Sequence, residues 1–171
     1  TYIHMGDNQP YPNAPKAACE DYAGELGFEV LPAITFSLIP GNYSRQCRQL
    51  ESMNPDYVFL ANLDKSVSTL LMQCRGIGLE LQYMVNIWGF DETVMQTAGL
   101  AANNVVWVMG AASWQDTVPG IYLVREISKM SDPEQEKYRS VHYLRGVCSM
   151  FYLKEAIENA MENGVLTGRS I

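Results

Sequence analysis

The feature that most constrains the fold is a near-continuous apolar run, DYVFLA at residues 56–61, in the middle of the chain. Such a run is typical of a buried strand in a parallel sheet, because helices cover both faces of that kind of sheet. Apolar residues then recur at helical spacing from Val67 to Ile77, and Gly76 and Gly78 end this helix. The two segments predict one strand and helix of an α/β protein.

The same alternation is repeated along the first two thirds of the chain. Further strands are expected at residues 1–5, 28–36, 82–85 and 105–109, and further helices at about residues 13–26, 43–53 and 91–98. Strands that alternate with helices imply parallel strands joined by right-handed crossovers. Pro32 favours an edge position for the second strand, because proline cannot donate a ladder hydrogen bond. We therefore expect an α/β fold over residues 1–118, a doubly wound, mostly parallel five-stranded sheet with helices on both faces.

The pattern changes from Pro119 onward. Residues 121–130 have the pattern of a helix, residues 131–133 break it, and residues 135–163 are helical almost throughout. No strand accompanies this long helix. We therefore expect residues 119–171 to leave the α/β unit or to cap it.

Composition and charge exclude several classes of partner. The 171 residues are 47% hydrophobic, enough for a sizeable core. The formal net charge is −7 and no cluster of Lys and Arg occurs, which argues against nucleic acid, because binding it needs a concentrated positive field. No apolar run approaches the roughly 20 residues that span a bilayer. The chain begins with Thr1, so we expect a processed or excised segment, with any signal peptide upstream.

The cysteines are far apart in the sequence and form no CxxC pair, which argues against a zinc site or a thioredoxin-type motif. They are Cys19, Cys47, Cys74 and Cys148. Each falls on an expected helix, so buried free thiols are the default interpretation. A disulfide between Cys47 and Cys74 is the alternative if their helices are neighbours. We expect neither a metal nor a cofactor.

The common motifs of α/β enzymes do not occur. Neither GxGxxG nor GxxxxGK[ST] is present, which disfavours a nucleotide site, and the lack of GxSxG disfavours an α/β-hydrolase. His4 lies inside the first strand, where a core or edge position is favoured over a catalytic base. Asp7 and Asp64 follow strands and could form a pair of acids, but the acid cluster and the partner lysine of a receiver domain are missing. We expect no enzyme activity.

Candidate binding residues lie in the loops that follow the strands. In an open parallel sheet, ligands bind beyond the carboxyl ends of the strands, at the topological switch point. This rule selects the loops at residues 6–12, 62–65, 86–90 and 110–119. Between them they carry Asn8, Gln9, Tyr11, Asn62, Asp64, Asn86, Trp88, Ser113 and Trp114. Large aromatic side chains with short amides are typical of a pocket for a small, partly apolar ligand.

Three stretches resemble a known family. DYVFLANLDKSVSTLLMQCRGIGL at residues 56–79 resembles a segment of type I periplasmic solute-binding proteins of branched-chain amino acid ABC transporters. In that segment an aspartate precedes an apolar strand, a short loop and a helix with Gln, and Gly-Leu follows. ACEDYAGELGFEVL at residues 18–31 is similar to the first helix and second strand of their second lobe. YLKEAIENAMENGVLTGRSI at residues 152–171 is similar to their long late helix.

The resemblance implies a division of the chain between two lobes. In this family the chain builds the first lobe, crosses to the second and returns to the first. Residues 1–118 would then be the second, ligand-binding lobe, and residues 119–171 would be returning helices that belong to, or pack toward, the first lobe. The opening segment of the first lobe would be missing, so the chain would hold half of the ligand cleft.

The resemblance also implies ligand-binding residues. Tyr11 matches a tyrosine that follows the first strand of the second lobe and faces the ligand, although Pro12 replaces the family's glycine. Leu63 or Asp64 matches a residue that closes over the ligand after the third strand. Two further residues on the selected loops complete the expected ligand-binding set, Asn8 and Trp114.

The loop after the fourth strand departs from the family's pattern. In the amino-acid binders an acid at this place meets the ligand's ammonium group, whereas this chain has Asn86, Ile87 and Trp88. A cation in a closed cleft needs a paired charge. Asn86 and Trp88 are therefore expected to meet a flat or apolar ligand, such as an aromatic or aliphatic carboxylate or an amide. The anchor for a carboxylate would usually lie on the missing lobe.

The function that the resemblance implies is that of a solute-binding protein of an ABC importer. Such a protein captures a small organic solute by hinge closure and delivers it to a membrane permease. In the class that the family is named for, the solute is like a branched-chain amino acid. We expect a periplasmic or extracellular location, with a lipid anchor as one option through the missing N-terminus. The first alternative is a ligand-sensing domain of a receptor or regulator with the same fold. The second is a flavodoxin-like enzyme, which would need a cofactor at the strand ends.

Overall fold

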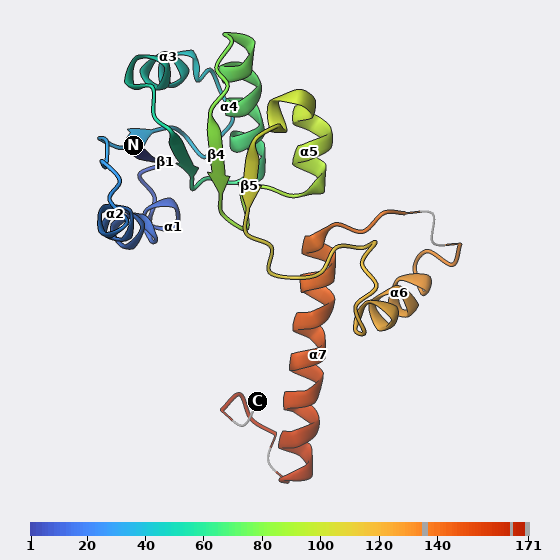
Figure 1. Ribbon diagram of the computed structural model, residues 1–171. Coiled ribbons are helices and arrows are strands. Elements are labelled where there is room, and N and C mark those ends of the chain that lie inside the picture. The colour runs from blue at the N-terminus through green and yellow to red at the C-terminus, as the bar shows by residue number, and fades with distance from the viewer. Residues whose placement is uncertain (135–136, 165, 170–171) are drawn as a thin grey trace. The chain divides into compact units, whose positions relative to one another are not determined.

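The computed structural model describes residues 1–134, 137–164 and 166–169. The chain forms two compact units, Thr1–Val108 and Met109–Ile171 (Figure 1). In the described part of the chain, all strands lie in the first unit, and the regular elements of the second unit are two helices. The assignment of residues 119–171 to a first lobe stays a prediction.

The first unit is built on a parallel sheet with the strand order β2-β1-β3-β4-β5. Its strands are β1 (Tyr2–Gly6), β2 (Ile34–Thr35), β3 (Tyr57–Leu60), β4 (Gln82–Val85) and β5 (Val105–Trp107). All neighbouring strands pair in parallel. The predicted α/β fold with a five-stranded sheet is confirmed.

β2 is shorter than the strand that the sequence predicts at residues 28–36. Only Ile34 and Thr35 pair with β1 as a strand, and Val30 makes an isolated bridge with Tyr2. Pro32 lies between these two points and has no N–H group for a ladder hydrogen bond. The edge position expected from Pro32 is confirmed, and the same residue explains why the strand is short.

Helices cover both faces of the sheet, as expected. The connections contain α1 (Pro10–Asn13), α2 (Lys16–Glu25), α3 (Ser44–Met53), α4 (Asp64–Gly76), α5 (Glu92–Ala98) and the 3-10 helix η1 (Gly99–Ala102). The chain passes from β1 to β2 toward one edge of the sheet and from β3 to β5 toward the other. Right-handed crossovers therefore place α2 and α4 on opposite faces. Figure 1 shows α1 and α2 on one side of the strands and α3, α4 and α5 on the other.

The main hydrophobic core combines one face of the sheet with α3, α4 and α5. Alternate strand residues contribute to it, such as Ile3 and Met5 from β1 and Val58 and Leu60 from β3, none of which is exposed. The buried residues of α4 in this core are Val67, Leu70, Leu71 and Cys74. Because full burial of one aliphatic side chain contributes about 1.5–3 kcal/mol, this core dominates the stability of the unit.

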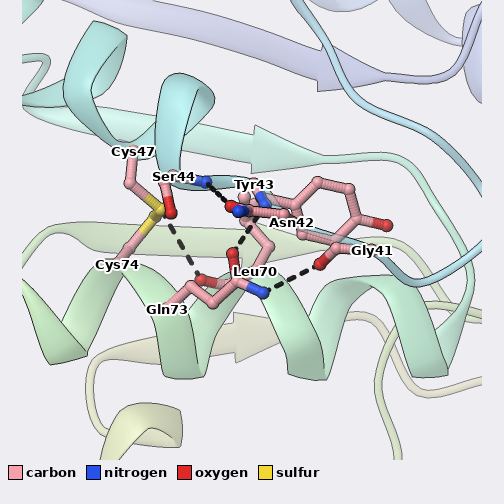
Figure 2. Close-up of a disulfide and its surroundings, with 8 residues drawn as sticks. All are labelled: Gly41, Asn42, Tyr43, Ser44, Cys47, Leu70, Gln73 and Cys74. Atoms are coloured by element: carbon pink, nitrogen blue, oxygen red, sulfur yellow. Dashed lines mark hydrogen bonds between the residues drawn. A yellow bond between two sulfur atoms is a disulfide. The ribbon is translucent and has the colours of Figure 1, made fainter.

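A buried disulfide joins α3 to α4 inside this core (Figure 2). Cys47 and Cys74 have Cα atoms 5.0 Å apart, and neither residue is exposed. Beside the disulfide, the Gln73 side chain accepts a hydrogen bond from the Tyr43 N–H at 2.6 Å and donates one to the Gly41 carbonyl at 2.8 Å. The loop before α3 is thereby tied to α4 at the same place.

The disulfide corrects the default interpretation of the cysteines. Free thiols were expected first at all four positions, and only Cys19 and Cys148 are free. The alternative that depended on neighbouring helices holds for Cys47 and Cys74, because the β2-β1-β3 order brings the helices after β2 and β3 together. Cys148 is exposed and Cys19 is half-buried, so neither is a fully buried thiol.

The turn of α1 is seated on β1 by two residues of that strand. His4 is 1% exposed, and its Nε2 atom lies 3.1 Å from the Pro12 carbonyl oxygen. A carbonyl only accepts hydrogen bonds, so Nε2 carries the proton and donates. A Cβ atom at Gly6 would lie 2.8 Å from the Pro12 Cβ, so the close approach of the turn requires glycine there. Pro12 is correspondingly buried.

The environment of His4 opposes its protonation. Burial lowers the pKa of His4, and the nearby Lys16 charge adds to this effect, while the Pro12 carbonyl acts against it. The His4 ring packs against Phe59 with 5.6 Å between the ring centroids. Its buried Nδ1 atom has no hydrogen-bond partner within the described residues. A proton added to Nδ1 would therefore place an unpaired charge in the interior.

The second unit contains α6 (Ile121–Lys129) and α7 (Val141–Glu162). Ile121, Val124 and Leu144 form its small buried cluster. The helix predicted at residues 135–163 begins only at Val141. In the connection before it, Arg139 donates a hydrogen bond to the Ser128 hydroxyl at 2.8 Å.

Some of the sequence features named for this unit lie outside the described residues. They are the predicted start of the long helix at residues 135–136, together with residues 165 and 170–171 of the stretch that resembles the family's late helix. The helices that the structure describes are all too short or too polar to cross a membrane.

We predict that the Cys47–Cys74 disulfide contributes substantially to stability. It closes a loop across 27 positions of the sequence, and cross-linking a loop of this size is expected to raise the free energy of unfolding by about 3 kcal/mol. The double substitution Cys47→Ala and Cys74→Ala should therefore lower the urea midpoint clearly. Cys148→Ser, at an exposed free thiol, is the matched control. Equal midpoints for the double variant and the wild type would contradict this prediction.

We predict that His4 makes the fold sensitive to mild acid. Its folded-state pKa lies below the ordinary value of 6.5, so the unfolded chain binds the proton more readily. Above about pH 6.5 stability is unaffected, and it falls as the pH drops toward the folded-state pKa. In His4→Gln, which can still donate to Pro12, urea unfolding at pH 7.5 and pH 5.5 should differ less than in the wild type. His142→Gln is the control, and an unchanged difference in His4→Gln would refute the assignment.

Candidate functional site

The candidate site is the edge of the first unit at the carboxyl ends of its strands. β1 leads to β2 at one edge of the sheet, whereas its other neighbour β3 leads toward β4 and β5. β1 and β3 therefore flank the topological switch point, where the connections diverge and open sheets bind their ligands. We refer to the loops that follow β1, β2, β3 and β4 at this edge as the rim.

The loop after β1 forms a tight turn organised by Asp7. One oxygen of the Asp7 carboxylate accepts a hydrogen bond from the Gln9 N–H at 3.0 Å, and the other accepts from the Leu38 N–H at 2.9 Å. Pro10 then begins α1, where proline is tolerated because the first helical N–H groups have no partner in the helix. Tyr11 follows on this turn and is 40% exposed. The turn thus presents the tyrosine ring at the rim.

Asn8 lies within this turn, between Asp7 and Gln9, and is exposed. Its side-chain oxygen lies 3.5 Å from the hydroxyl of Thr35, the last residue of β2. Asn8 is thus placed between the loop after β1 and the end of β2. Its ligand contact stays a prediction.

The loop after β3 contains Asn62, whose side chain is fully buried. Its Oδ1 atom accepts a hydrogen bond from the Asp7 N–H at 2.8 Å, and its Nδ2 atom donates to the carbonyls of Phe36 at 3.0 Å and Ser37 at 3.1 Å. Sequence reasoning placed Asn62 among the polar groups of a pocket. In the structure its side chain instead binds the backbone of the neighbouring loops.

The residues that follow Asn62 reach the rim. Leu63 is 40% exposed, and Asp64 is the first residue of α4. The Asp64 N–H donates a hydrogen bond to the Trp88 carbonyl at 3.1 Å. The loops after β3 and β4 are therefore joined directly beside both candidate residues.

The loop after β4 is organised by Asn86. The Nδ2 atom of Asn86 donates to the Ala61 carbonyl at 2.5 Å, and its Oδ1 atom accepts from the N–H groups of Trp88 and Gly89 at 2.9 and 2.7 Å. All of these bonds go to backbone atoms. Trp88, whose N–H is one of these donors, is itself 44% exposed.

One loop of the rim was missed by sequence reasoning. The loop after β2 also leaves the carboxyl edge of the sheet, beside β1, and carries the exposed residues Ser37 and Ile39. Pro40-Gly41 does predict a turn between this strand and α3. This turn was left out of the candidate loops because the sequence does not show that β2 lies next to β1.

Trp114 and Ser113 belong to the second unit rather than to the rim of the first. The Trp114 carbonyl accepts a hydrogen bond from the Arg125 guanidinium at 2.6 Å, and the guanidinium carbon lies 5.6 Å from the centre of the Trp114 ring. The Asp116 carboxylate accepts from the Ser113 N–H at 2.8 Å. The ligand-binding role of Trp114 stays a prediction.

The rim has the chemistry of a binding surface. Its large exposed side chains are Tyr11, Leu63 and Trp88, whereas the amide groups of Asn62 and Asn86 are bound to backbone. Within the described residues, no three His, Cys, Asp or Glu side chains converge in a way that could hold a metal ion. Exposed aromatic and aliphatic side chains of this kind are suited to contact with an apolar or aromatic group.

Comparison with solved structures finds the same fold in other proteins. A branched-chain amino acid ABC transporter protein from Thermus thermophilus with bound valine matches with a TM-score of 0.87 at 21% identity, over 99% of this chain and 45% of that one. A fatty acid ABC transporter substrate-binding protein from Thermomonospora curvata matches with a TM-score of 0.85 at 17% identity, over 99% of this chain and 43% of that one.

A third similar structure is described as an extracellular ligand-binding receptor from Rhodopseudomonas palustris. It matches with a TM-score of 0.77 at 16% identity, over 94% of this chain and 46% of that one. This chain therefore spans less than half the length of the three solved proteins. No curated protein sequence matches it significantly.

Comparison with family models covers the whole chain. The model described as "Periplasmic binding protein" matches residues 1–171. Its members are binding proteins for transport and not enzymes, in agreement with the absence of enzyme motifs. Because this match covers the whole chain, the chain belongs to the periplasmic binding protein family.

Proposed function

We propose that this chain is part of a solute-binding protein of an ABC importer and that its rim forms one side of the ligand site. The observation that carries the proposal is the division of roles on the rim. Tyr11, Leu63 and Trp88 are exposed there, while buried or half-buried amides hold the loops that carry them. Family membership and the similar transport proteins support the same role.

The chemistry of the rim favours a ligand whose near side is flat or apolar. Asn86 occupies the place where the amino-acid binders of the resembling family have an acid, and its amide is bound to backbone. The Asp7 carboxylate accepts two backbone N–H groups. An ammonium group would therefore lack a paired charge after the fourth strand. An aromatic or aliphatic carboxylate, or an amide, fits better. One of the similar structures is described as a fatty acid ABC transporter substrate-binding protein, and a fatty acid is an aliphatic carboxylate.

The disulfide supports an extracytoplasmic location. Structural disulfides persist in the periplasm and outside the cell, whereas the cytosol keeps thiols reduced. Cys47 and Cys74 are joined in the interior of the first unit. We therefore infer a periplasmic or extracellular protein that closes over its solute by a hinge movement and delivers it to a membrane permease.

A ligand-sensing receptor domain is the second candidate. One observation favours it, since a similar structure is described as an extracellular ligand-binding receptor. Ligand capture by the rim would be the same in both cases, and the difference would lie in the partner. Pull-down of the full-length protein with an ABC permease supports the importer, and co-purification with a signalling partner supports the receptor.

A thermal-shift screen of the full-length protein tests the ligand class. We expect aromatic carboxylates, fatty acids or small amides to raise the melting temperature, since a ligand at 100 times its Kd adds about 2.7 kcal/mol of stability. Amino acids and polyamines at the same concentration are the comparison set. Stabilisation by branched-chain amino acids alone would show that our interpretation of Asn86 and Trp88 is wrong.

Substitution of the two rim aromatics tests the site. Tyr11→Ala and Trp88→Ala should each weaken the affinity for the compound found in the screen by about 10- to 100-fold, because each removes a large ring from the contact. Tyr22→Ala is the matched control, since Tyr22 is 60% exposed on α2 and outside the rim. Isothermal titration calorimetry measures the affinity. Unchanged affinity in both rim variants would remove the rim from the ligand site.

A further inference from the structure

Asn62 is the point where three loops of the rim meet. Its fully buried side chain binds the Asp7 N–H in the loop after β1 and the carbonyls of Phe36 and Ser37 in the loop after β2. The residue itself lies in the loop after β3. Both hydrogens of the amide nitrogen and the amide oxygen are used, so the buried group is satisfied only while all three loops keep their places.

Asp7 makes a second link between two of these loops. Its carboxylate accepts from the Leu38 N–H in the loop after β2 and from the Gln9 N–H at the start of the turn that carries Tyr11. The Asn13 side chain closes the same turn by donating to the Asp7 carbonyl at 2.8 Å. The turn that carries Tyr11 is therefore linked to Asn62 through Asp7.

The loop that carries Trp88 is attached on the other side of Asn62. The Asn86 side chain donates to the carbonyl of Ala61, the residue before Asn62. Gly89 packs so closely that a Cβ atom there would lie 2.6 Å from the Asn62 carbonyl oxygen. The Trp88 carbonyl accepts from the Asp64 N–H. Contacts thus run without a break from the Tyr11 turn through residues 61 and 62 to Trp88.

We propose that Asn62 is a positioning residue that presets the spacing between Tyr11 and Trp88 before a ligand arrives. The effect of Asn62 on ligand binding rests on the proposed function, whereas its coupling of the loops rests on the hydrogen bonds alone. A site held in its bound arrangement does not have to order its loops when the ligand enters, which improves affinity without any contact from Asn62 itself. The buried amide thus acts through the two aromatic residues.

Amide hydrogen exchange in the full-length protein tests the coupling without any ligand. In Asn62→Leu, which has the same branched shape and no side-chain hydrogen bonds, the protection of the Asp7 and Leu38 amides should fall about tenfold, the factor expected for one lost buried hydrogen bond. Val58→Ala is the matched control, because Val58 is fully buried in the core and outside the rim. It should lower the melting temperature without a selective change at these two amides.

Asn62→Asp provides a readout that general destabilisation would not produce. A protonated carboxyl can donate to a Phe36 or Ser37 carbonyl, whereas an ionised one can only accept. Protection of the Leu38 amide should therefore fall as the pH rises through the pKa of the new carboxyl, while the Asp7 amide, whose N–H still has an acceptor, stays protected. The wild type should show no such titration.

Binding is measured with three probes, L-valine, benzoate and decanoate. For each probe that binds the wild type, affinity should fall about tenfold in Asn62→Leu and stay unchanged in Val58→Ala. Wild-type protection in Asn62→Leu, or the same loss of affinity in Val58→Ala, would overturn the positioning role. If none of the probes binds the wild type, the proposed function loses support, and the exchange results alone decide the role of Asn62.

Discussion

The parallel pairing of β1 with β3 is the constraint on which the rest of the first unit depends. The register sets Met5 opposite Leu60, so both strands end at the same level and their loops start side by side. Asp7 and Asn62 can then share a hydrogen bond although 55 positions separate them. The same pairing leaves β2 at the edge beside β1, and it brings α3 and α4 together closely enough for a disulfide.

This arrangement divides the rim residues by role. Short polar side chains that follow the strands bind backbone groups of neighbouring loops, because a backbone group that leaves the sheet inside the protein still needs a partner. Large side chains that follow these polar residues are exposed, as Tyr11, Leu63 and Trp88 are. On this rim, the short polar residues near the strand ends hold the loops, and the exposed large residues are the candidates for ligand contact.

The sequence predicted the fold closely and part of the rim on which the candidate site residues lie. The apolar run at residues 56–61 and the alternation around it were sufficient to predict the strands, since burial on both faces leaves a clear compositional signal. Candidate residues on four loops followed from the strand order. The burial of Asn62 could not be predicted, because an asparagine after a strand has the same local sequence whether it faces a ligand or a neighbouring loop. The loop after β2 was missed because the sequence does not show that β2 lies beside β1 in the sheet.

By itself, the sequence determined the parallel α/β class, because the alternation of strand and helix periodicity is a local property of the chain. Three stretches of the sequence also carried the resemblance to the family that the chain belongs to. Only the tertiary structure decided which residues become partners across long separations. It joined Cys47 to Cys74, placed Pro12 against Gly6 and turned the Asn62 amide toward three loops. The physical reason is that a disulfide, a close backbone contact and a buried amide each depend on the distance between distant segments, and only the packed sheet sets that distance.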